Sequence, residues 1–362
     1  MRGLVNEHIL KLKPYVPGKP IDEVRREFGI KDIVKLASNE NPVGPSPKAL
    51  DAMKKAIGDV ALYPDGSCFA LTRALAAKWG VGENHIICGN GSDELIHYIG
   101  ITFLSATDEV ISSDVTFSRY ESAAVLNNCE YKSAPACRHK YSLDEIAARI
   151  NSNTRLIIIA NPNNPTGTIV TKEEVDRFMA KVPERVIVVF DEAYYEYVES
   201  PDYPDTLDYV RQGKNVIILH TFSKIYGLAG LRIGYGIARP EIIAGLHQVR
   251  EPFNVNSLAQ AAAIAALEDV AHVDKIRKIN AQGRDYLYAQ FDKMGLPYAR
   301  TEANFIWVDI KQDCRPVFTE LLKRGVIIRT GDIFGCPTFI RVTIGTMDEN
   351  ERFIKTIKEV LE

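Results

Sequence analysis

The sequence LIIIANPNNPTG (residues 156–167) contains the pattern on which the fold depends, and this pattern recurs as VIVVFDEAY (186–194) and VIILHTFSK (216–224). Each stretch begins with a short, wholly apolar run and continues into polar residues. A strand with a continuous apolar run, rather than an alternating one, is typical of a sheet that is covered on both faces. Helical patterns at 142–150 and 171–181 lie between such runs. This alternation predicts a parallel, doubly wound α/β sheet.

The same pattern extends on both sides of these stretches. We expect a strand that ends in a loop at residues 36–42, further strands at 81–88, 108–112, 129–133 and 231–236, and helices at 21–28 and 117–127. After about residue 240 the helical patterns predominate, at 239–248, 257–268 and 269–294, and the last of these is long and amphipathic. The tail predicts strands at 304–309, 326–329 and 338–343 and helices at 314–324 and 347–361.

This change of character predicts a division into a large α/β domain and a smaller α+β domain. We expect an N-terminal arm with part of the small domain at 1–42, a large domain at 43–268, a linking helix at 269–294 and a small C-terminal domain at 295–362.

Composition excludes several classes of protein. The 362 residues carry 44 Lys and Arg against 47 Asp and Glu, a net charge of −3, which argues against a dedicated nucleic-acid binder. No apolar run approaches the roughly 20 residues that a membrane span needs. The six cysteines are scattered without a CxxC pair, which is typical of reduced thiols in a cytoplasmic protein. The seven histidines form no metal-binding pattern, so we expect no metal.

Four polar features follow the predicted strands, at the sheet edge where open α/β sheets bind ligands. They are Asn164 in the proline-rich turn, Asp191 with Tyr194, the group Thr221, Ser223, Lys224 and Arg232, and the helix start Gly91-Ser92-Asp93. Each alone has an ordinary explanation: a loop, a helix cap, a solvated lysine or a common helix start.

Together these features fit one ligand. The helix start, the two hydroxyls and Arg232 suit a phosphate. A lysine of lowered pKa, such as Lys224 among cations, can attack an aldehyde. Asp191 suits a ring cation, and Asn164 with Tyr194 suits a phenolic oxygen. Pyridoxal phosphate has all four groups.

At this point the sequence resembles a known family. NPTG (164–167), DEAY (191–194) and SKIYGLAGLRIG (223–234) together resemble the class I/II aminotransferases, which are pyridoxal-phosphate enzymes of fold type I. Within that class the chain resembles the histidinol-phosphate aminotransferases along essentially its whole length. The motifs that carry this closer likeness are LKPYVPGKP (12–20), LASNENPVGPSP (36–47), YPDGS (63–67), GNGSDE (89–94), TFSRY (116–120), GVIIRTG (325–331) and IRVTIGT (340–346).

The resemblance implies a role for each matching residue. Lys224 would bond to the cofactor aldehyde, Asp191 would hold the ring nitrogen, and Phe117 would stack on the ring. Tyr194 and Asn164 would contact the ring oxygen. The cofactor phosphate would lie among Gly91, Ser92, Asp93, Thr221, Ser223 and Arg232. Tyr63 would reach the site of a partner subunit, which implies a homodimer. Substrate would contact Tyr15, Asn39, Arg329 and Arg341.

The implied reaction transfers the amino group of L-histidinol phosphate to 2-oxoglutarate, giving imidazole acetol phosphate and L-glutamate, in cytoplasmic histidine biosynthesis. Three other interpretations stay open at this point. They are an aromatic amino-acid aminotransferase on the same scaffold, a phosphothreonine decarboxylase of cobamide synthesis, and a cofactor-binding regulatory domain.

Overall fold

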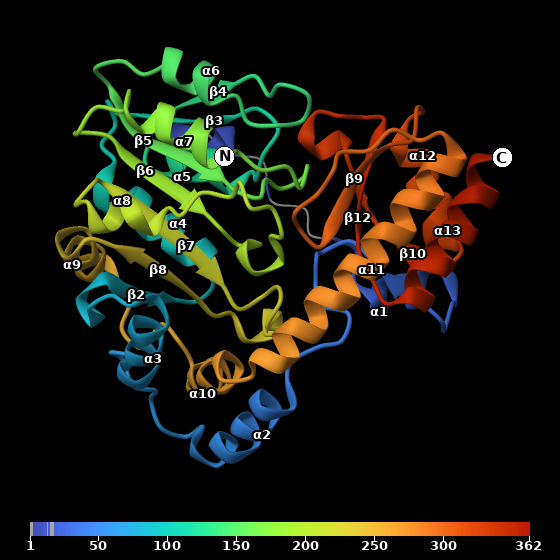
Figure 1. Cartoon of the computed structure of the whole chain (residues 1–362), viewed down its shortest axis with the longest axis horizontal. Coiled ribbons are helices and arrows are strands. Elements are labelled where there is room, and N and C mark those ends of the chain that lie inside the picture. Colours follow the sequence, from blue (N-terminus) through green and yellow to red (C-terminus); the bar gives the residue numbers. More distant parts are fainter. Residues whose placement is uncertain (1–2, 13, 15–17) are drawn as a thin grey trace.

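A seven-stranded sheet forms the centre of the larger part of the chain. The computed structural model describes residues 3–12, 14 and 18–362. The strand order is β2-β8-β7-β6-β5-β3-β4, and the strands from β7 to β4 are parallel (Figure 1). Only β8 runs antiparallel to both of its neighbours, β2 and β7. The bounds are β2 (Ile86–Gly89), β3 (Glu109–Ser113), β4 (Glu130–Ala134), β5 (Thr154–Ala160), β6 (Ile187–Asp191), β7 (Val216–Thr221) and β8 (Gly234–Ala238).

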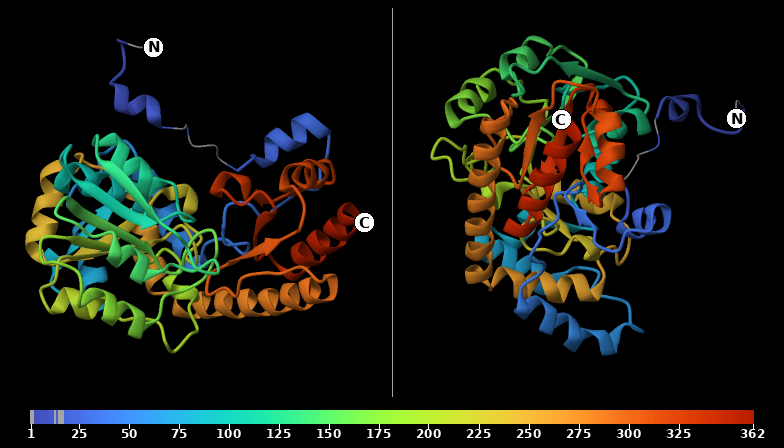
Figure 2. Two further views of the ribbon diagram at one scale, coloured as in Figure 1. Left: turned by 90° about the horizontal axis from the view of Figure 1, so that it is seen from above. Right: turned by 90° about the vertical axis from the view of Figure 1, so that its right-hand side faces the viewer.

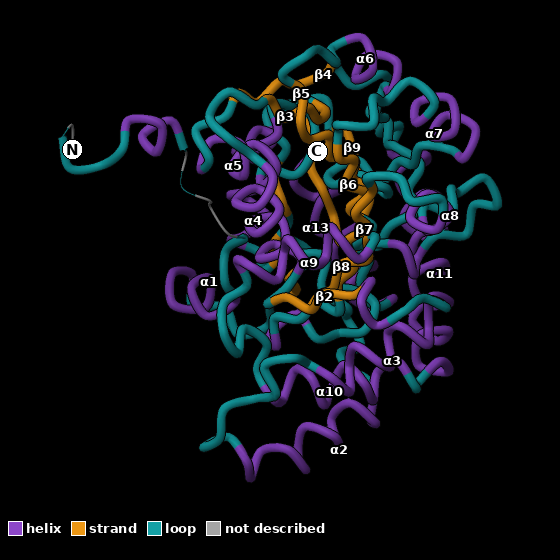
Figure 3. Tube along the Cα trace, turned by 90° about the vertical axis from the view of Figure 1, so that its left-hand side faces the viewer, coloured by secondary structure: helices purple, strands orange, loops and turns teal. Residues whose placement is uncertain are grey.

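Helices cover both faces of this sheet, which confirms the predicted doubly wound α/β fold. Figure 3 shows the sheet edge-on, with α4 (Ser92–Phe103), α5 (Arg119–Leu126) and α9 (Pro240–Val249) on one side and α7 (Lys172–Met179) and α8 (Leu207–Arg211) on the other. The central strands are buried along their whole length, as their continuous apolar runs require. The other helices of this part are α2 (Pro47–Ala56), α3 (Phe69–Trp79), α6 (Leu143–Ala148) and α10 (Ser257–Leu267).

A smaller α+β unit lies beside the first (Figure 1). Its antiparallel sheet has the order β11-β12-β9, with β9 (Phe305–Asp309), β11 (Arg329–Thr330) and β12 (Phe339–Thr343). Packed around it are α12 (Cys314–Lys323) and α13 (Met347–Leu361), whose start is fixed by a capping box between Thr346 and Glu349. The long helix α11 (Val270–Met294) runs along both parts (Figure 2).

The N-terminal segment contributes to the smaller unit. Here β1 (Val34–Lys35) pairs with β10 (Val326–Ile327), and α1 (Ile21–Phe28) packs nearby through Val24. A short 3-10 helix, residues 7–11, stands apart from this unit (Figure 2). The two parts have separate hydrophobic cores. The boundaries at residues 42, 268 and 294 stay predictions.

Several local predictions were wrong. The strand expected within 36–42 lies earlier, at Val34–Lys35, and the left-handed backbone of Asn39 (φ 55°) is incompatible with an extended strand through 36–42. Within 81–88, residues 83–85 form a 3-10 turn and the strand begins at Ile86. Helices α2 and α3 were not predicted. Ser46 caps α2 by accepting a hydrogen bond from the Ala49 amide, a start signal that the sequence does contain.

Candidate active site

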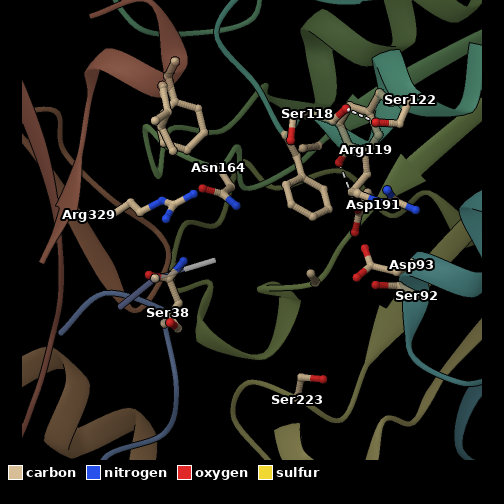
Figure 4. Close-up of a pocket in the computed structure, with 18 of the residues that line it drawn as sticks. Ser38, Ser92, Asp93, Ser118, Arg119, Ser122, Asn164, Asp191, Ser223 and Arg329 are labelled. Atoms are coloured by element: carbon tan, nitrogen blue, oxygen red, sulfur yellow. Dashed lines mark hydrogen bonds between the residues drawn. The ribbon is translucent and has the colours of Figure 1, made fainter. Parts of the chain in front are cut away.

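A cavity of about 980 Å³ opens at the carboxyl ends of β5, β6 and β7 and is closed on the other side by the smaller unit. Most of the site residues that we predicted from the sequence line this cavity. Those lining it are Asn39, Ser92, Asp93, Phe117, Asn164, Asp191, Tyr194, Thr221, Ser223, Lys224, Arg232, Arg329 and Arg341. Figure 4 shows Arg329 and Asn164 on one side of the cavity, and Asp191, Asp93 and Ser92 on the other.

Lys224 lies in the loop that follows β7. Its Nζ donates a hydrogen bond to the Ser38 carbonyl at 3.2 Å and lies 5.7 Å from the centre of the Tyr194 ring. Burial, with a smaller contribution from the nearby Arg341 guanidinium, lowers the pKa of Lys224 to about 8. About a tenth of this amine is therefore neutral at pH 7, and the neutral amine is the state that can act as a nucleophile or a base.

Asp191 ends β6 and is 5% exposed. Its Oδ2 accepts a hydrogen bond from the Tyr120 hydroxyl at 2.7 Å. Its Oδ1 is buried and has no hydrogen-bond partner among the residues that the structure describes. Burial raises the pKa of Asp191 to about 6, although the Tyr120 hydrogen bond opposes this rise. A buried carboxylate with an unpartnered oxygen favours a cationic or N–H ligand at that point.

The helix start at 91–93 lies at the cavity. Ser92 is the first residue of α4, and the N-cap is Gly91, which has no side chain to bond to the free amides of the first turn. The Arg232 guanidinium lies 3.7 Å from Asp93 and donates to the Ser223 hydroxyl at 3.4 Å. Free helix amides, hydroxyls and an arginine converge here, which is a typical setting for a phosphate.

Two glycines leave space around Arg232 and the first turn of α4. A Cβ at Gly91, whose φ is +81°, would lie 2.7 Å from Arg232 Nη2. A Cβ at Gly234 would lie 2.7 Å from the Ser92 amide nitrogen. Side chains at either position would therefore block the groups that an anion would bind.

Tyr194 and Asn164 are each tied to a segment of the smaller unit. The Asn39 side-chain amide donates to the Tyr194 hydroxyl at 2.9 Å, and Arg341 donates to the Asn164 side-chain oxygen. Phe117 lies across the cavity and packs edge-on against Tyr120, with ring centres 5.8 Å apart. These three side chains surround the space between Lys224 and Asp191.

Arg329 and Arg341 are directly opposite each other on β11 and β12. Arg341 is 6% exposed, donates to the Ala37 carbonyl at 2.6 Å and stacks over the Phe305 ring. Like charges directly opposite on neighbouring strands repel each other. Two such arginines in a cavity wall favour a bound anion, and a phosphate or carboxylate suits their geometry.

Tyr63 does not line the cavity of its own chain. Tyr63 is 83% exposed and stacks on Phe253, with ring centres 4.7 Å apart. Tyr15 lies outside the described residues. Gly91 borders the cavity only through its contact with Arg232.

The predicted site residues do not include Tyr120 or the carbonyl groups of Ala37 and Ser38, which the structure places at the site. Tyr120 lies in the quoted motif TFSRY, three residues after Phe117, so helical spacing within the helix predicted at 117–127 could have placed both side chains on one face. No sequence pattern predicts the role of the Ala37 and Ser38 carbonyl groups, because that role depends on where the N-terminal segment crosses the cavity.

These residues fit pyridoxal phosphate. The unpartnered Asp191 oxygen suits a protonated ring nitrogen, and the open corner at Gly91 suits the phosphate. A half-buried lysine of lowered pKa lies between them. Among the described residues no group of three or more His, Cys, Asp or Glu side chains could hold a metal, and no helix is long and apolar enough to cross a bilayer.

Comparisons with known proteins agree with this site. The sequence model of the family "Aminotransferase class I and II" matches residues 31–357. The histidinol-phosphate aminotransferase of Moorella thermoacetica is 56% identical over 356 residues, covering 98% of this chain and 92% of that protein. That of Caldicellulosiruptor saccharolyticus is 47% identical, covering 99% of this chain and 100% of that protein.

A solved structure agrees as well. The histidinol-phosphate aminotransferase from Sinorhizobium meliloti, in complex with pyridoxal-5'-phosphate, matches with a TM-score of 0.92 at 28% identity. The match covers 99% of this chain and 98% of that one. The chain therefore belongs to the class I and II aminotransferases and, within them, to the histidinol-phosphate aminotransferase family.

Proposed function

We propose that this protein transfers the amino group of L-histidinol phosphate to 2-oxoglutarate, and that Lys224 and Asp191 carry the chemistry. Enzymes of this family use pyridoxal phosphate. The observation that carries the proposal is the arrangement of Lys224, of lowered pKa, between the buried Asp191 and the cross-strand pair Arg329 and Arg341. The relatives named above support the choice of substrate.

Bound pyridoxal phosphate supplies an aldehyde that captures the substrate amine and a ring that accepts the electron pair left when the substrate carbon loses a proton. The neutral Lys224 amine removes that proton, because its Nζ lies inside the cavity. Asp191 Oδ1 would hold a proton on the ring nitrogen of the bound cofactor, which would keep the ring electron-poor. Tyr120 keeps the Asp191 carboxylate in place through Oδ2.

Arg329 and Arg341 hold the substrate anion. Histidinol phosphate presents a phosphate, whereas glutamate and 2-oxoglutarate present a carboxylate, so one pair of arginines serves both half-reactions. Arg341, which would bind the substrate anion, also donates a hydrogen bond to Asn164, which would contact the ring oxygen of the cofactor. This hydrogen bond therefore connects the substrate-binding and cofactor-binding residues.

A single half-reaction tests the substrate. Purified holoenzyme is mixed with L-histidinol phosphate, or with L-phenylalanine, without an oxo acid, and the cofactor absorbance is followed. Rapid conversion to the amine form by histidinol phosphate and slow conversion by phenylalanine is the expected result. The reverse order would assign the protein to aromatic amino acids. Release of carbon dioxide without amine transfer would contradict transamination.

We also propose that the protein works as a homodimer with shared sites. Apolar side chains are exposed along residues 50–69, including Leu62 at 70% and Tyr63 at 83%. A patch of this kind marks an interaction surface. In the dimer, Tyr63 of each subunit reaches the cavity of the other.

Mixing two inactive variants tests this assignment. Tyr63→Ala and Lys224→Ala are each prepared, mixed, dissociated and reassociated. A mixed dimer contains one cavity with both an intact Lys224 and an intact Tyr63, so activity is expected to return toward about a quarter of the wild-type value. Activity that stays at the level of the Tyr63→Ala variant alone would contradict a shared site.

We propose a cytoplasmic location. All six cysteines, each within the described part of the chain, carry free thiols, and such thiols are typical of a reducing compartment.

A further inference from the structure

Behind the sheet, on the side away from the cavity, lie two buried titratable residues that the proposed chemistry does not use. Glu192 directly follows Asp191, and His220 directly precedes Thr221. Successive side chains of a strand point to opposite faces. Asp191 and Thr221 line the cavity, whereas Glu192 and His220 do not. Glu192 is 2% exposed and His220 is 1% exposed.

The two side chains are neighbours. His220 Nε2 lies 3.5 Å from Glu192 Oε2, and Thr206 donates a hydrogen bond to Glu192 Oε1 at 2.6 Å. The His220 ring is stacked between Trp79 of α3 and Tyr235 of β8, at 4.8 and 5.1 Å between ring centres. Neither ring nitrogen makes a hydrogen bond of normal geometry in the described ranges, and the Glu192 carboxyl, 3.5 Å from Nε2, is the acidic group that faces the ring.

The charges around the pair favour its neutral form. Lys78 of α3 faces His220, and Asp205, Glu196 and Asp191 face Glu192. Burial and the three nearby carboxyl groups raise the pKa of Glu192 to about 8. Burial and the Lys78 ammonium lower the pKa of His220 to about 3. Glu192 therefore keeps its proton at neutral pH, and the imidazole is uncharged.

We propose that Glu192 and His220 are positioning residues. They form a buried, uncharged pair that fixes the carboxyl ends of β6 and β7, and so Asp191 and Thr221, without adding a second negative charge beside Asp191. The backbone supports this coupling, since the Glu192 amide donates to the Leu219 carbonyl at 2.9 Å, directly before His220. The inference rests on the function proposed above, but its first test needs no substrate.

The first test measures the protonation of His220 directly. The holoenzyme is labelled with ¹⁵N-histidine, and the His220 signals are assigned as those lost in His220→Phe, which keeps an aromatic ring in the stack. The ring is expected to stay neutral from about pH 5 to about pH 9. A ring that titrates near its ordinary pKa of about 6.5, or is doubly protonated at neutral pH, would overturn the proposal.

The second test compares substitutions of the carboxyl. Glu192→Ala leaves the Thr206 hydroxyl and the His220 ring without their partner. We expect its Kd for pyridoxal phosphate to rise at least about tenfold and its kcat to fall, with the KM for 2-oxoglutarate unchanged. Glu192→Gln is neutral and has the same shape, so it is expected to recover most of both losses. Glu109→Gln, another buried glutamate that lies far from the cavity on β3, is the matched control and should leave the cofactor Kd unchanged.

Two outcomes would contradict the positioning role. A Gln variant as impaired as the Ala variant would mean that an ionised carboxylate is needed. The Glu192→Ala variant could also lose thermal stability while its cofactor Kd and the pH midpoint of its cofactor absorbance stay at the wild-type values. That result would mean that Glu192 has a structural role only. If Glu192→Ala does not fold, Thr206→Val takes its place, with a smaller effect expected in the same direction. Failure of the histidinol phosphate half-reaction with the wild-type enzyme would contradict the proposed function and leave the ¹⁵N result standing.

Discussion

Asp191 should make the cofactor-free protein less stable at neutral pH. Its folded-state pKa is about 6 against an ordinary value of 3.8. A group whose pKa is raised by folding stabilises the protein below its unfolded pKa, and this contribution is lost as the pH rises through the folded pKa. Because each pKa unit corresponds to about 1.4 kcal/mol, ionised Asp191 costs the cofactor-free protein roughly 3 kcal/mol above pH 6.

The substitution Asp191→Asn removes this cost without changing the shape of the side chain. The asparagine oxygen can still accept the hydrogen bond from Tyr120. We therefore expect the cofactor-free variant to be more stable than the wild type at pH 7.5, by up to about 3 kcal/mol, and equally stable at about pH 4. Urea unfolding followed by circular dichroism, at one fixed protein concentration, measures both differences.

A control with the opposite sign is available in Glu109→Gln. Burial alone would raise the pKa of Glu109, but hydrogen bonds from Lys132 and Asn151 lower it. Its ionised form therefore stabilises the fold above its unfolded pKa, and this contribution is lost as the pH falls through the lower folded pKa. The Gln variant should thus be less stable than the wild type at pH 7.5. If Asp191→Asn gives no stability gain at pH 7.5, or a gain that does not change with pH, the electrostatic account of Asp191 is wrong.

Three further substitutions test other parts of the site. Lys224→Ala should abolish transamination and leave no cofactor adduct that borohydride can reduce; sustained turnover would remove Lys224 from the mechanism. Tyr120→Phe removes the hydrogen bond from Tyr120 to the Asp191 carboxylate, so the cofactor Kd measured by absorbance titration should rise roughly tenfold or more. An unchanged Kd would show that Tyr120 does not position Asp191. Arg341→Ala should raise the KM for both histidinol phosphate and 2-oxoglutarate by roughly a hundredfold, since both are anions; a change in neither in steady-state kinetics would place the substrate anion elsewhere.

The sequence by itself determined the central sheet and the chemical identity of the site. The continuous apolar runs at 156–160, 186–190 and 216–219 specify buried parallel strands, because burial on both faces leaves no position for polar side chains. Asn164, Asp191 and Lys224 follow these strands within a few residues, so their place at one sheet edge follows from strand direction alone. Their chemistry is a property of the side chains and needs no tertiary information.

The tertiary structure decided the contacts that join distant segments. Tyr120 reaches Asp191 across 71 residues, Asn39 reaches Tyr194 across 155, and Arg341 reaches Asn164 across 177. The register that places Arg329 opposite Arg341, and the packing that puts His220 beside Glu192, are likewise set by how whole elements pair. No local pattern encodes these contacts, because side-chain periodicity fixes which face a residue occupies and only the packing of complete elements fixes which residue it meets.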